Sequence, residues 1–322
     1  MSGHKNDETK GAPQCPAKNK AEGISRRGFL TLAGLGSCAM VTGAGAKALA
    51  NSDFGGWPGS YGMLTDFTKC VGCRSCEAAC NEANNLPAPA QPFDSQAVLD
   101  AVRRPDNKAY TVVNRYPNPN EPDKPVFRKI QCNHCMEPAC ATACPIHAYT
   151  KTPEGAVIYD EDLCFGCRYC MIACPFYVPA YDYDSPTKPK VMKCILCYDR
   201  IKEGRIPACA EACPMGAVTF GRRDDLIKLA RKRIAAKPGL YLDYIYGERE
   251  VGGTNWIYIS HVPFEQLGFP ANLPKRPLIE LTRGFLNSVP MVFTVWPMLF
   301  GVVYAAMRRK DEKPEHKEEV HK

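Results

Sequence analysis

The sequence predicts an α+β fold held together by metal-ligating cysteines and not by a large apolar core. Three observations predict it. The 322-residue chain contains 18 cysteines, sixteen of them fall into four similar motifs, and short β-branched or aromatic runs flank those motifs. The strand-like runs are Tyr61–Leu64, Val126–Ile130, Ala156–Tyr159 and Ala217–Phe220, and residues 152–155 (Thr-Pro-Glu-Gly) predict a hairpin turn.

The N-terminus has the features of an exported protein. Arg26-Arg27 lies in a twin-arginine pattern, a weakly apolar run follows from Gly28 to Gly45, and Ala48-Leu49-Ala50 offers a small-residue cleavage site. These features predict a twin-arginine signal peptide over residues 1–50, and a basic cytoplasmic tail is the alternative. The twin-arginine export machinery moves proteins that are already folded, which suits a protein that takes up metal as it folds. Cys38 lies in a segment that resembles a lipoprotein box, so lipidation there stays open.

Four cysteine motifs fill the middle of the chain and define a predicted domain over residues 51–222. In order they are Cys70-x2-Cys73-x2-Cys76-x3-Cys80, Cys132-x2-Cys135-x4-Cys140-x3-Cys144-Pro145, Cys164-x2-Cys167-x2-Cys170-x3-Cys174-Pro175 and Cys194-x2-Cys197-x11-Cys209-x3-Cys213-Pro214. The third has the spacing of the bacterial ferredoxin run, in which the fourth cysteine ligates the neighbouring cluster. The motifs therefore predict a doubled bacterial-ferredoxin-like domain with four 4Fe–4S clusters.

Disulfides and structural zinc are the alternatives for so many cysteines. The only cysteines outside the motifs are Cys15 and Cys38, both in the predicted leader, so sixteen divide evenly into four groups of four. A three-plus-one run with a trailing proline also differs from the paired knuckles of a zinc site. Iron–sulfur cubes are therefore the favoured interpretation.

The segments between and after the motifs carry weaker signals. Residues 86–125 are rich in Pro, Asn and Asp, which predicts a long surface insertion. Residues 223–284 form a predicted C-terminal extension in which Asp224–Ala235 has helical periodicity. We expect the basic side chains of that helix, Arg231, Lys232 and Arg233, to be solvated.

Several residues beside the cysteines invite a redox role. His134 lies between two ligands but is expected to pack or face solvent, because thiolates complete the ligand count. We expect packing around the cubes, not electron conduction, from the aromatic residues Phe165, Tyr169, Phe176 and Tyr177. Four basic residues next to ligands could raise cluster potentials or could simply be solvated: Lys69, Lys129, Arg168 and Lys193.

The C-terminal region predicts a membrane anchor. Residues 285–307 contain no charged side chain and, as a helix, span roughly 34 Å, enough for a bilayer core. Six Lys or Arg lie in the fifteen residues after this segment and three in the fifteen before it. The positive-inside rule then places the charged tail, 308–322, in the cytoplasm and residues 51–284 outside. A buried core helix or an amphipathic surface segment is the alternative.

The net charge gives no argument for nucleic acid. The formal charge is +7, but residues 51–322 hold only 34 basic and 31 acidic side chains, a balance of +3. Each oxidised 4Fe–4S cube with four thiolates adds about −2, which leaves the mature protein near −5. We therefore expect no nucleic-acid partner.

These motifs resemble the four-cluster iron–sulfur subunit family of respiratory oxidoreductases, and most of all its hydrogenase-2 type. The resemblance runs from the leader to the last helix. Beyond the cysteines, residues 61–64, 237–239, 246–250, 252–254 and 262–263 carry it (Tyr-Gly-Met-Leu, Lys-Pro-Gly, Tyr-Gly-Glu-Arg-Glu, Gly-Gly-Thr and Val-Pro). The Gly-Gly-Thr segment recurs across the wider family and does not single out hydrogenases.

The resemblance implies that ligands cross over between motifs, with the outer motifs (70–80 and 194–213) forming one pair and the inner motifs (132–174) the other. The implied sets are Cys70, Cys73, Cys76 with Cys213; Cys80 with Cys194, Cys197, Cys209; Cys132, Cys135, Cys140 with Cys174; and Cys144 with Cys164, Cys167, Cys170. Some family members replace one ligand and hold a three-iron cluster. No ligand is missing here, so four complete cubes are expected.

The resemblance also implies partners. Family members connect a catalytic subunit to a polytopic quinone-reactive membrane subunit of the NrfD/HybB type. The chain is thus expected to relay electrons from a nickel–iron hydrogenase at the periplasmic face of the inner membrane, without being an enzyme itself. Three alternatives remain: the β subunit of a formate dehydrogenase or other molybdopterin enzyme, an enzyme with an open iron, and an assembly protein whose cubes only staple the fold.

Overall fold

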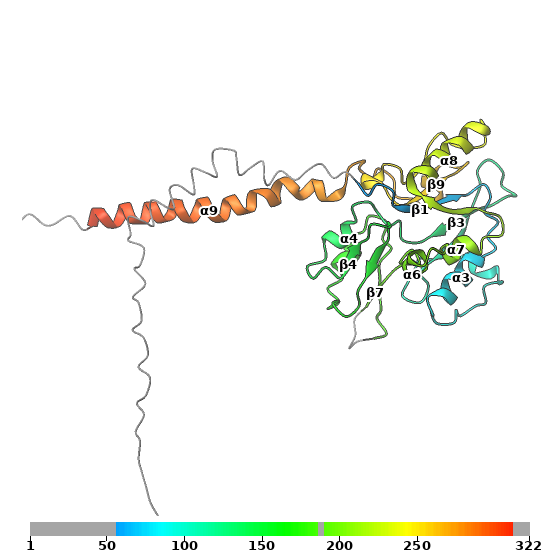
Figure 1. Ribbon diagram of the computed structural model, residues 1–322, viewed down its shortest axis with the longest axis horizontal. Helices are drawn as coiled ribbons and strands as arrows, with labels where there is room; N and C mark the ends of the chain where they lie inside the picture. The colour runs from blue at the N-terminus through cyan, green and yellow to red at the C-terminus, as the bar shows by residue number, and fades with distance from the viewer. Residues whose placement is uncertain (1–55, 186–189, 312–322) are drawn as a thin grey trace, which may run out of the picture. The chain divides into compact units, whose positions relative to one another are not determined.

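The computed structural model describes residues 56–185 and 190–311. The predicted signal peptide, Cys15 and Cys38, and all but the first residues of the predicted tail lie outside the described residues. Within them, one body contains the cysteine motifs and is followed by a long C-terminal helix (Figure 1).

A three-stranded sheet forms the centre of the body. Strand β1 (Tyr61–Asp66) lies between β8 (Val218–Arg222), to which it is antiparallel, and β9 (Trp256–Ile259), to which it is parallel. Met63 pairs with Phe220 on one side and with Trp256 on the other. Helix α8 (Arg223–Ala236) packs beside this sheet (Figure 1). The predicted strands at 61–64 and 217–220 are confirmed, whereas β9 was not predicted.

Short elements carry the cysteine motifs. The hairpins are β2 (Val112–Tyr116) with β3 (Val126–Ile130), β4 (Tyr149–Lys151) with β5 (Val157–Tyr159), and β6 (Ala180–Tyr181) with β7 (Val191–Met192). The helices are α3 (Ser75–Ala83), α4 (Ala139–Thr142), α5 (Tyr169–Ala173), α6 (Tyr198–Lys202) and α7 (Ala208–Glu211). Single 3₁₀ turns are η1 (Ala97–Asp100), η2 (Glu250–Gly252) and η3 (Phe264–Leu267). The predicted strands at 126–130 and 156–159 and the turn at 152–155 are confirmed.

An aromatic core lies against the central sheet, so the expectation of a fold without a large apolar core is wrong here. Tyr258 stacks on Phe67 with ring centroids 5.6 Å apart, and Phe269 meets both Tyr258 and Tyr246, at 5.0 and 4.5 Å. All four are buried. Burying each such ring contributes roughly 1.5–3 kcal/mol. The predicted C-terminal extension, 223–284, thus supplies much of the core.

The predicted surface insertion, 86–125, is only partly on the surface. Tyr110, Val112 and Val113 are buried, and Asn114 is fully buried with its side chain bonded to the backbone of Arg103. This prediction is wrong for β2 because a β-branched run inside a Pro- and Asn-rich segment pairs with β3.

Helix α8 confirms the predicted helix, but its basic face is not uniformly solvated. Arg231 and Lys232 are exposed, whereas Arg233 is mostly covered and its Nη1 lies 3.3 Å from the buried Asp66 carboxylate. The Tyr241 hydroxyl donates a second hydrogen bond to the same carboxylate, at 3.0 Å. Arg233 therefore helps to tie α8 to β1.

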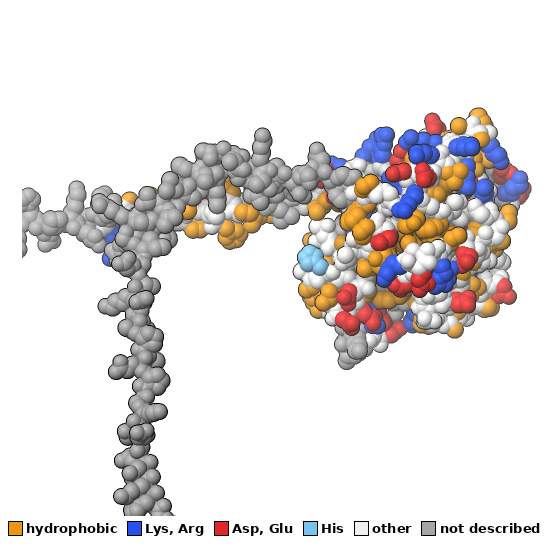
Figure 2. All heavy atoms as spheres, viewed as in Figure 1, with side chains coloured by type: hydrophobic (Ala, Val, Ile, Leu, Met, Phe, Trp, Pro, Cys, Tyr) orange, Lys and Arg blue, Asp and Glu red, His pale blue; other side chains and the backbone are white. Residues whose placement is uncertain are grey.

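Helix α9 (Leu278–Asp311) is 34 residues long, and Ser288–Arg308 within it is long and apolar enough to cross a membrane. None of that segment is buried in the body. The helix continues through Pro290 and Pro297, and the Thr294 hydroxyl donates to the Pro290 carbonyl at 2.9 Å. Visible side chains of α9 are mostly hydrophobic, while charged side chains gather over the α8 end of the body (Figure 2).

The β4–β5 turn joins the segment with the inner motifs, residues 132–174, to the central sheet. The Tyr61 N–H donates to the Glu154 carbonyl at 2.8 Å, and the Lys151 ammonium bonds the Gly155 carbonyl and the Asn255 side chain. Gly155 has φ of 103°, and a Cβ there would lie 2.5 Å from the Tyr61 carbonyl oxygen. Only glycine fits this approach.

We expect Gly155→Ala to destabilise the protein by about 1–3 kcal/mol, because the added methyl group separates the turn from β1 and strains the backbone. The measurement is the guanidinium chloride concentration at which half of the iron–sulfur absorbance is lost. Gly204→Ala is the matched control, since Gly204 also has a positive φ of 74° but a Cβ there meets nothing within 4 Å. Equal midpoints for the two variants would show that the close approach has no energetic role.

Candidate iron–sulfur sites

The sixteen motif cysteines line four separate cavities, four to each. Cavity A is lined by Cys70, Cys73, Cys76 and Cys213, and cavity B by Cys80, Cys194, Cys197 and Cys209. Cavity C is lined by Cys132, Cys135, Cys140 and Cys174, and cavity D by Cys144, Cys164, Cys167 and Cys170. These are the four groups that the resemblance implied.

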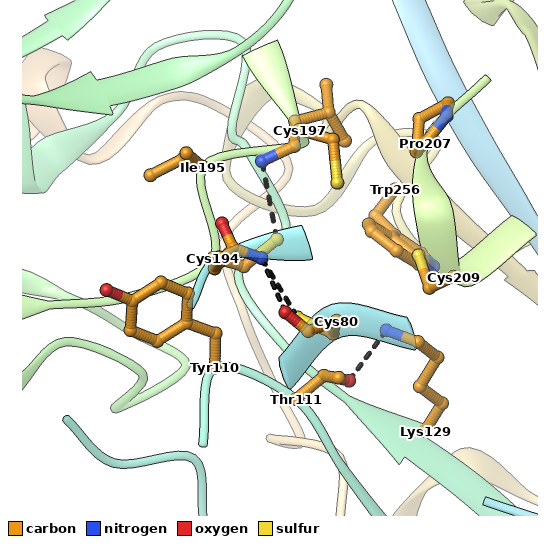
Figure 3. A pocket seen from close by; sticks show the side chains of 12 residues that line it. Cys80, Tyr110, Thr111, Lys129, Cys194, Ile195, Cys197, Pro207, Cys209 and Trp256 are labelled. Carbon is orange, nitrogen blue, oxygen red and sulfur yellow. Dashed lines mark hydrogen bonds between the residues drawn. The ribbon is translucent and has the colours of Figure 1, made fainter. Parts of the chain in front are cut away.

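Cavity B illustrates how distant segments converge. Cys80 comes from α3, Cys194 and Cys197 from the loop before α6, and Cys209 from α7. Their sulfur atoms face a common space, with Trp256 and Lys129 at its edge (Figure 3). Cys209 and Cys213 are four residues apart, yet they line different cavities. The outer motifs therefore cross over.

The arrangement of thiols fits a cube better than a single ion. Across 56–185 and 190–311, no three His, Cys, Asp or Glu side chains stand close enough together to hold one metal ion. Each group of thiols instead surrounds an open space, as it must to enclose a body with an iron at each of four corners. The donor set is all thiol, which suits iron–sulfur clusters.

All four cysteine loops share one backbone conformation. The residue two positions after the first cysteine has positive φ in each loop: 70° at Gly72, 48° at His134, 77° at Gly166 and 60° at Leu196. Two of these residues donate their N–H to the first sulfur of the loop, His134 to Cys132 and Leu196 to Cys194, both at 3.4 Å. Such N–H donors stabilise negative charge on the sulfur.

Proline sets where the helix after the loop ends. Helices α4, α5 and α7 all end before a Cys-Pro pair, because proline lacks the N–H that would continue the helix. The chain then turns so that the Ala148 N–H reaches Cys144 at 3.2 Å and the Ala217 N–H reaches Cys213 at 3.3 Å. These bonds hold the fourth sulfur of the second and fourth motifs.

The first motif reaches a similar result without proline. Asn81 stands where the other motifs have Pro, and α3 continues past Cys80 to Ala83. The Asn84 side-chain amide then bonds the Cys80 carbonyl at 2.7 Å and lies 3.6 Å from its sulfur. The Asn84 side chain replaces the backbone donor of the other motifs, a role that sequence reasoning missed.

Burial opposes ionisation of the thiols when no counter-charge is present. It raises the pKa of Cys70 to about 11 and that of Cys194 to about 12, and it also raises the pKa of Cys76 and Cys80. The ligating form is the thiolate, so the cationic iron core has to supply the compensation. Cluster insertion is therefore coupled to release of the thiol protons.

The four basic residues next to ligands divide into two classes. Lys129 and Lys193 are each 2% exposed, whereas Lys69 and Arg168 are exposed to solvent. Burial acts to lower the pKa of Lys129, but negative charge on Cys209, Cys76 and nearby cysteines raises it above its ordinary value. The burial of Lys129 and Lys193 fits a role in setting cluster potentials, whereas solvent screens the charges of Lys69 and Arg168.

His134 packs in the interior, as expected. It is fully buried, its Nδ1 accepts the Val157 N–H at 2.9 Å, and burial holds its pKa well below the usual range. The neutral imidazole thereby joins the second motif to β5.

The aromatic residues of the third motif do not all pack as predicted. Phe176 is partly buried and lines cavity C, but Phe165, Tyr169 and Tyr177 are 57%, 55% and 61% exposed. Phe165 nevertheless lines cavity D, so the prediction is confirmed for its position. It is wrong for Tyr169 and Tyr177, which line none of the four cavities, because the third motif lies at the surface, where Cys167 is itself exposed. Cavity D thus opens beside the exposed ring of Phe165.

Comparison with known proteins identifies the family. Residues 124–223 match the family model described as a 4Fe-4S dicluster domain. A protein of Nitratidesulfovibrio vulgaris is 52% identical over 90% of this chain and 78% of its own length. Hydrogenase-2 operon protein HybA of Shigella flexneri is 36% identical over 77% of this chain and 84% of its own.

A formate dehydrogenase relative matches over a similar extent. The formate dehydrogenase-O iron-sulfur subunit of Escherichia coli is 33% identical over 76% of this chain and 78% of its own length. The matches to these relatives cover three quarters or more of the chain. The chain therefore belongs to the family of iron–sulfur electron-transfer subunits of respiratory oxidoreductases, and within such a complex it is not itself the catalytic enzyme.

Proposed function

We propose that the chain is a membrane-anchored electron relay with four 4Fe–4S clusters, one in each of cavities A to D. The observation that supports this most directly is the grouping of sixteen thiols around four cavities, with no cysteine of residues 56–185 and 190–311 left over. In this proposal the ligands are the four sets named for the cavities. When bound, the cubes supply one-electron steps, and the chain holds them in series.

The proposed setting is the periplasmic face of the inner membrane. The twin-arginine pattern over residues 1–50, the apolar segment of α9 and the basic residues after it all support a body outside and a tail in the cytoplasm. We propose α9 as a single-pass anchor beside a quinone-reactive integral membrane subunit of the NrfD/HybB type.

The proposed electron donor is a nickel–iron hydrogenase. Similarity to HybA supports this choice, as does the combination of an own leader with a C-terminal anchor. The second candidate is the catalytic subunit of a formate dehydrogenase, which the match to formate dehydrogenase iron-sulfur subunits favours. Both candidates use the chain in the same way and differ only in its partner.

Metal analysis of the native complex tests the proposal. The complex is purified from detergent-solubilised membranes through a tag on this chain. We expect about sixteen or more irons per chain together with nickel, because four cubes hold four irons each. Molybdenum or tungsten without nickel would transfer the chain to a formate dehydrogenase, and iron far below sixteen with zinc in its place would exclude the four-cluster relay.

A further inference from the structure

Two lysines are buried in the body without a carboxylate partner. Lys129 is the fourth of the five residues of β3, and Lys193 follows β7 and directly precedes Cys194. Among the described residues, neither ammonium forms an ion pair with Asp or Glu. The buried Arg74 differs, since its guanidinium lies 2.9 Å from the Glu77 carboxylate.

The partners of both ammonium groups are neutral. The Lys129 Nζ donates to the Thr111 hydroxyl at 2.6 Å (Figure 3) and to the Gln131 side chain at 3.1 Å, and it lies 4.5 Å from the Trp256 ring centre. The Lys193 Nζ donates to the carbonyls of Val157 and Cys194. Dipoles and a ring fix the position of each charge but do not neutralise it.

An unpaired ammonium in a protein interior carries a penalty of several kcal/mol. A buried ammonium of this kind is tolerated where an anion lies nearby or where its charge contributes to function. Lys129 lines both cavity A and cavity B, and Lys193 lines cavity C. No buried Lys or Arg lines cavity D within the described part of the chain, where Arg168 is exposed.

We propose that Lys129 is a shared counter-charge for the clusters in cavities A and B, that Lys193 is the counter-charge for the cluster in cavity C, and that these charges set the reduction potentials of those three clusters. This inference rests on the proposed four-cluster function. A cube gains negative charge when it is reduced, so a fixed ammonium stabilises the reduced form more than the oxidised form. Each lysine thereby raises the potential of the clusters that it faces.

The position of Lys129 has a specific consequence. One side chain reaches two cavities, so its removal has to move two potentials together. Lys193 reaches one of the inner cavities, so its removal has to move a different potential. A residue that only packed the interior would not produce this pattern.

The test is a potentiometric titration, followed by electron paramagnetic resonance (EPR), of the purified complex carrying Lys129→Met or Lys193→Met. In Lys129→Met we expect the midpoints of clusters A and B to fall while those of C and D stay in place. In Lys193→Met we expect the midpoint potential of the cluster in cavity C to fall while that of the cluster in cavity A is unchanged. Lys129→Arg retains the positive charge, so the midpoint potentials of the clusters in cavities A and B should be closer to wild type than in Lys129→Met.

Lys69→Met is the matched control, because Lys69 adjoins Cys70 but is exposed, and solvent screens its charge. We expect all four midpoints to be unchanged in that variant. If Lys129→Met loses iron, Lys129→Gln keeps a hydrogen-bonding side chain and is titrated in its place.

Unchanged midpoints in a Lys129 variant that retains its iron would overturn the inference, and so would an equal fall of all four midpoints. Neither result would affect the proposed relay. A wild-type complex with fewer than four clusters would instead overturn the relay itself, so the two failures can be told apart.

Discussion

Cys209→Ser and Cys213→Ser are expected to damage different clusters, although the two residues are four positions apart in one short segment. Cys209 lines cavity B with Cys80, and Cys213 lines cavity A with Cys76. Serine does not replace a thiolate on iron, so each variant should lose between about one and four irons, as its cube is lost or becomes a three-iron cluster. Transfer of electrons through the complex should fall to background in both.

EPR of the reduced complex makes the comparison. The signal lost from Cys209→Ser should be the one lost from Cys80→Ser, and the signal lost from Cys213→Ser should be the one lost from Cys76→Ser. These four variants also assign the spectra needed to follow the effect of Lys129. Loss of the same signal from Cys209→Ser and Cys213→Ser would contradict the crossed ligand sets.

Glu77→Gln should cost about 3–5 kcal/mol of stability, because it leaves buried guanidinium charge without a counter-charge. The Glu77 side chain is 4% exposed, its Oε2 lies 2.9 Å from Arg74 Nη2, and its Oε1 lies 2.6 Å from Arg103 Nη2. The same Oε1 accepts the Val113 N–H at 2.6 Å. One carboxylate thus joins α3, with its cluster cysteines, to β2.

The guanidinium chloride concentration at which half of the iron–sulfur absorbance is lost measures this change. The EPR signal of the cluster in cavity A should disappear first, because its ligand Cys76 directly precedes Glu77. Glu82→Gln is the control, since Glu82 is on the same helix but exposed, and it should change stability by less than about 0.5 kcal/mol. A loss in Glu77→Gln no larger than in the control would mean that the buried ion pairs contribute nothing net.

The sequence predicted the cysteine sites better than the scaffold that holds them. Cysteine spacing follows directly from loop geometry, so the motifs were visible, and the resemblance supplied four groups that the structure brings together. The strands at 61–64 and 126–130 were also visible, because β-branched and aromatic residues mark them.

The missed features all depend on distant partners. The Trp256–Ile259 run of β9 has the aromatic and β-branched residues of a strand, but its parallel pairing with β1 joins segments far apart in the chain, which a local pattern does not show. The burial of Lys129 could not be read from its neighbours, since Lys69 also adjoins a ligand yet is exposed. The exposure of Tyr169 and Phe165 depends on which face of the third motif the rest of the chain covers. Local patterns do not contain that information.

The parallel pairing of β1 with β9 bears on the order of events during synthesis. Cavities C and D take all their cysteines from residues 132–174, so the inner half can organise from contacts that are close in sequence. The sheet behind cavities A and B needs Ile259 next to Asp66, a closure across most of the chain that carries a large loop entropy. The segment with the inner motifs can therefore fold during synthesis, whereas the sheet behind cavities A and B can close only after residues 256–259 have been made and released from the ribosome.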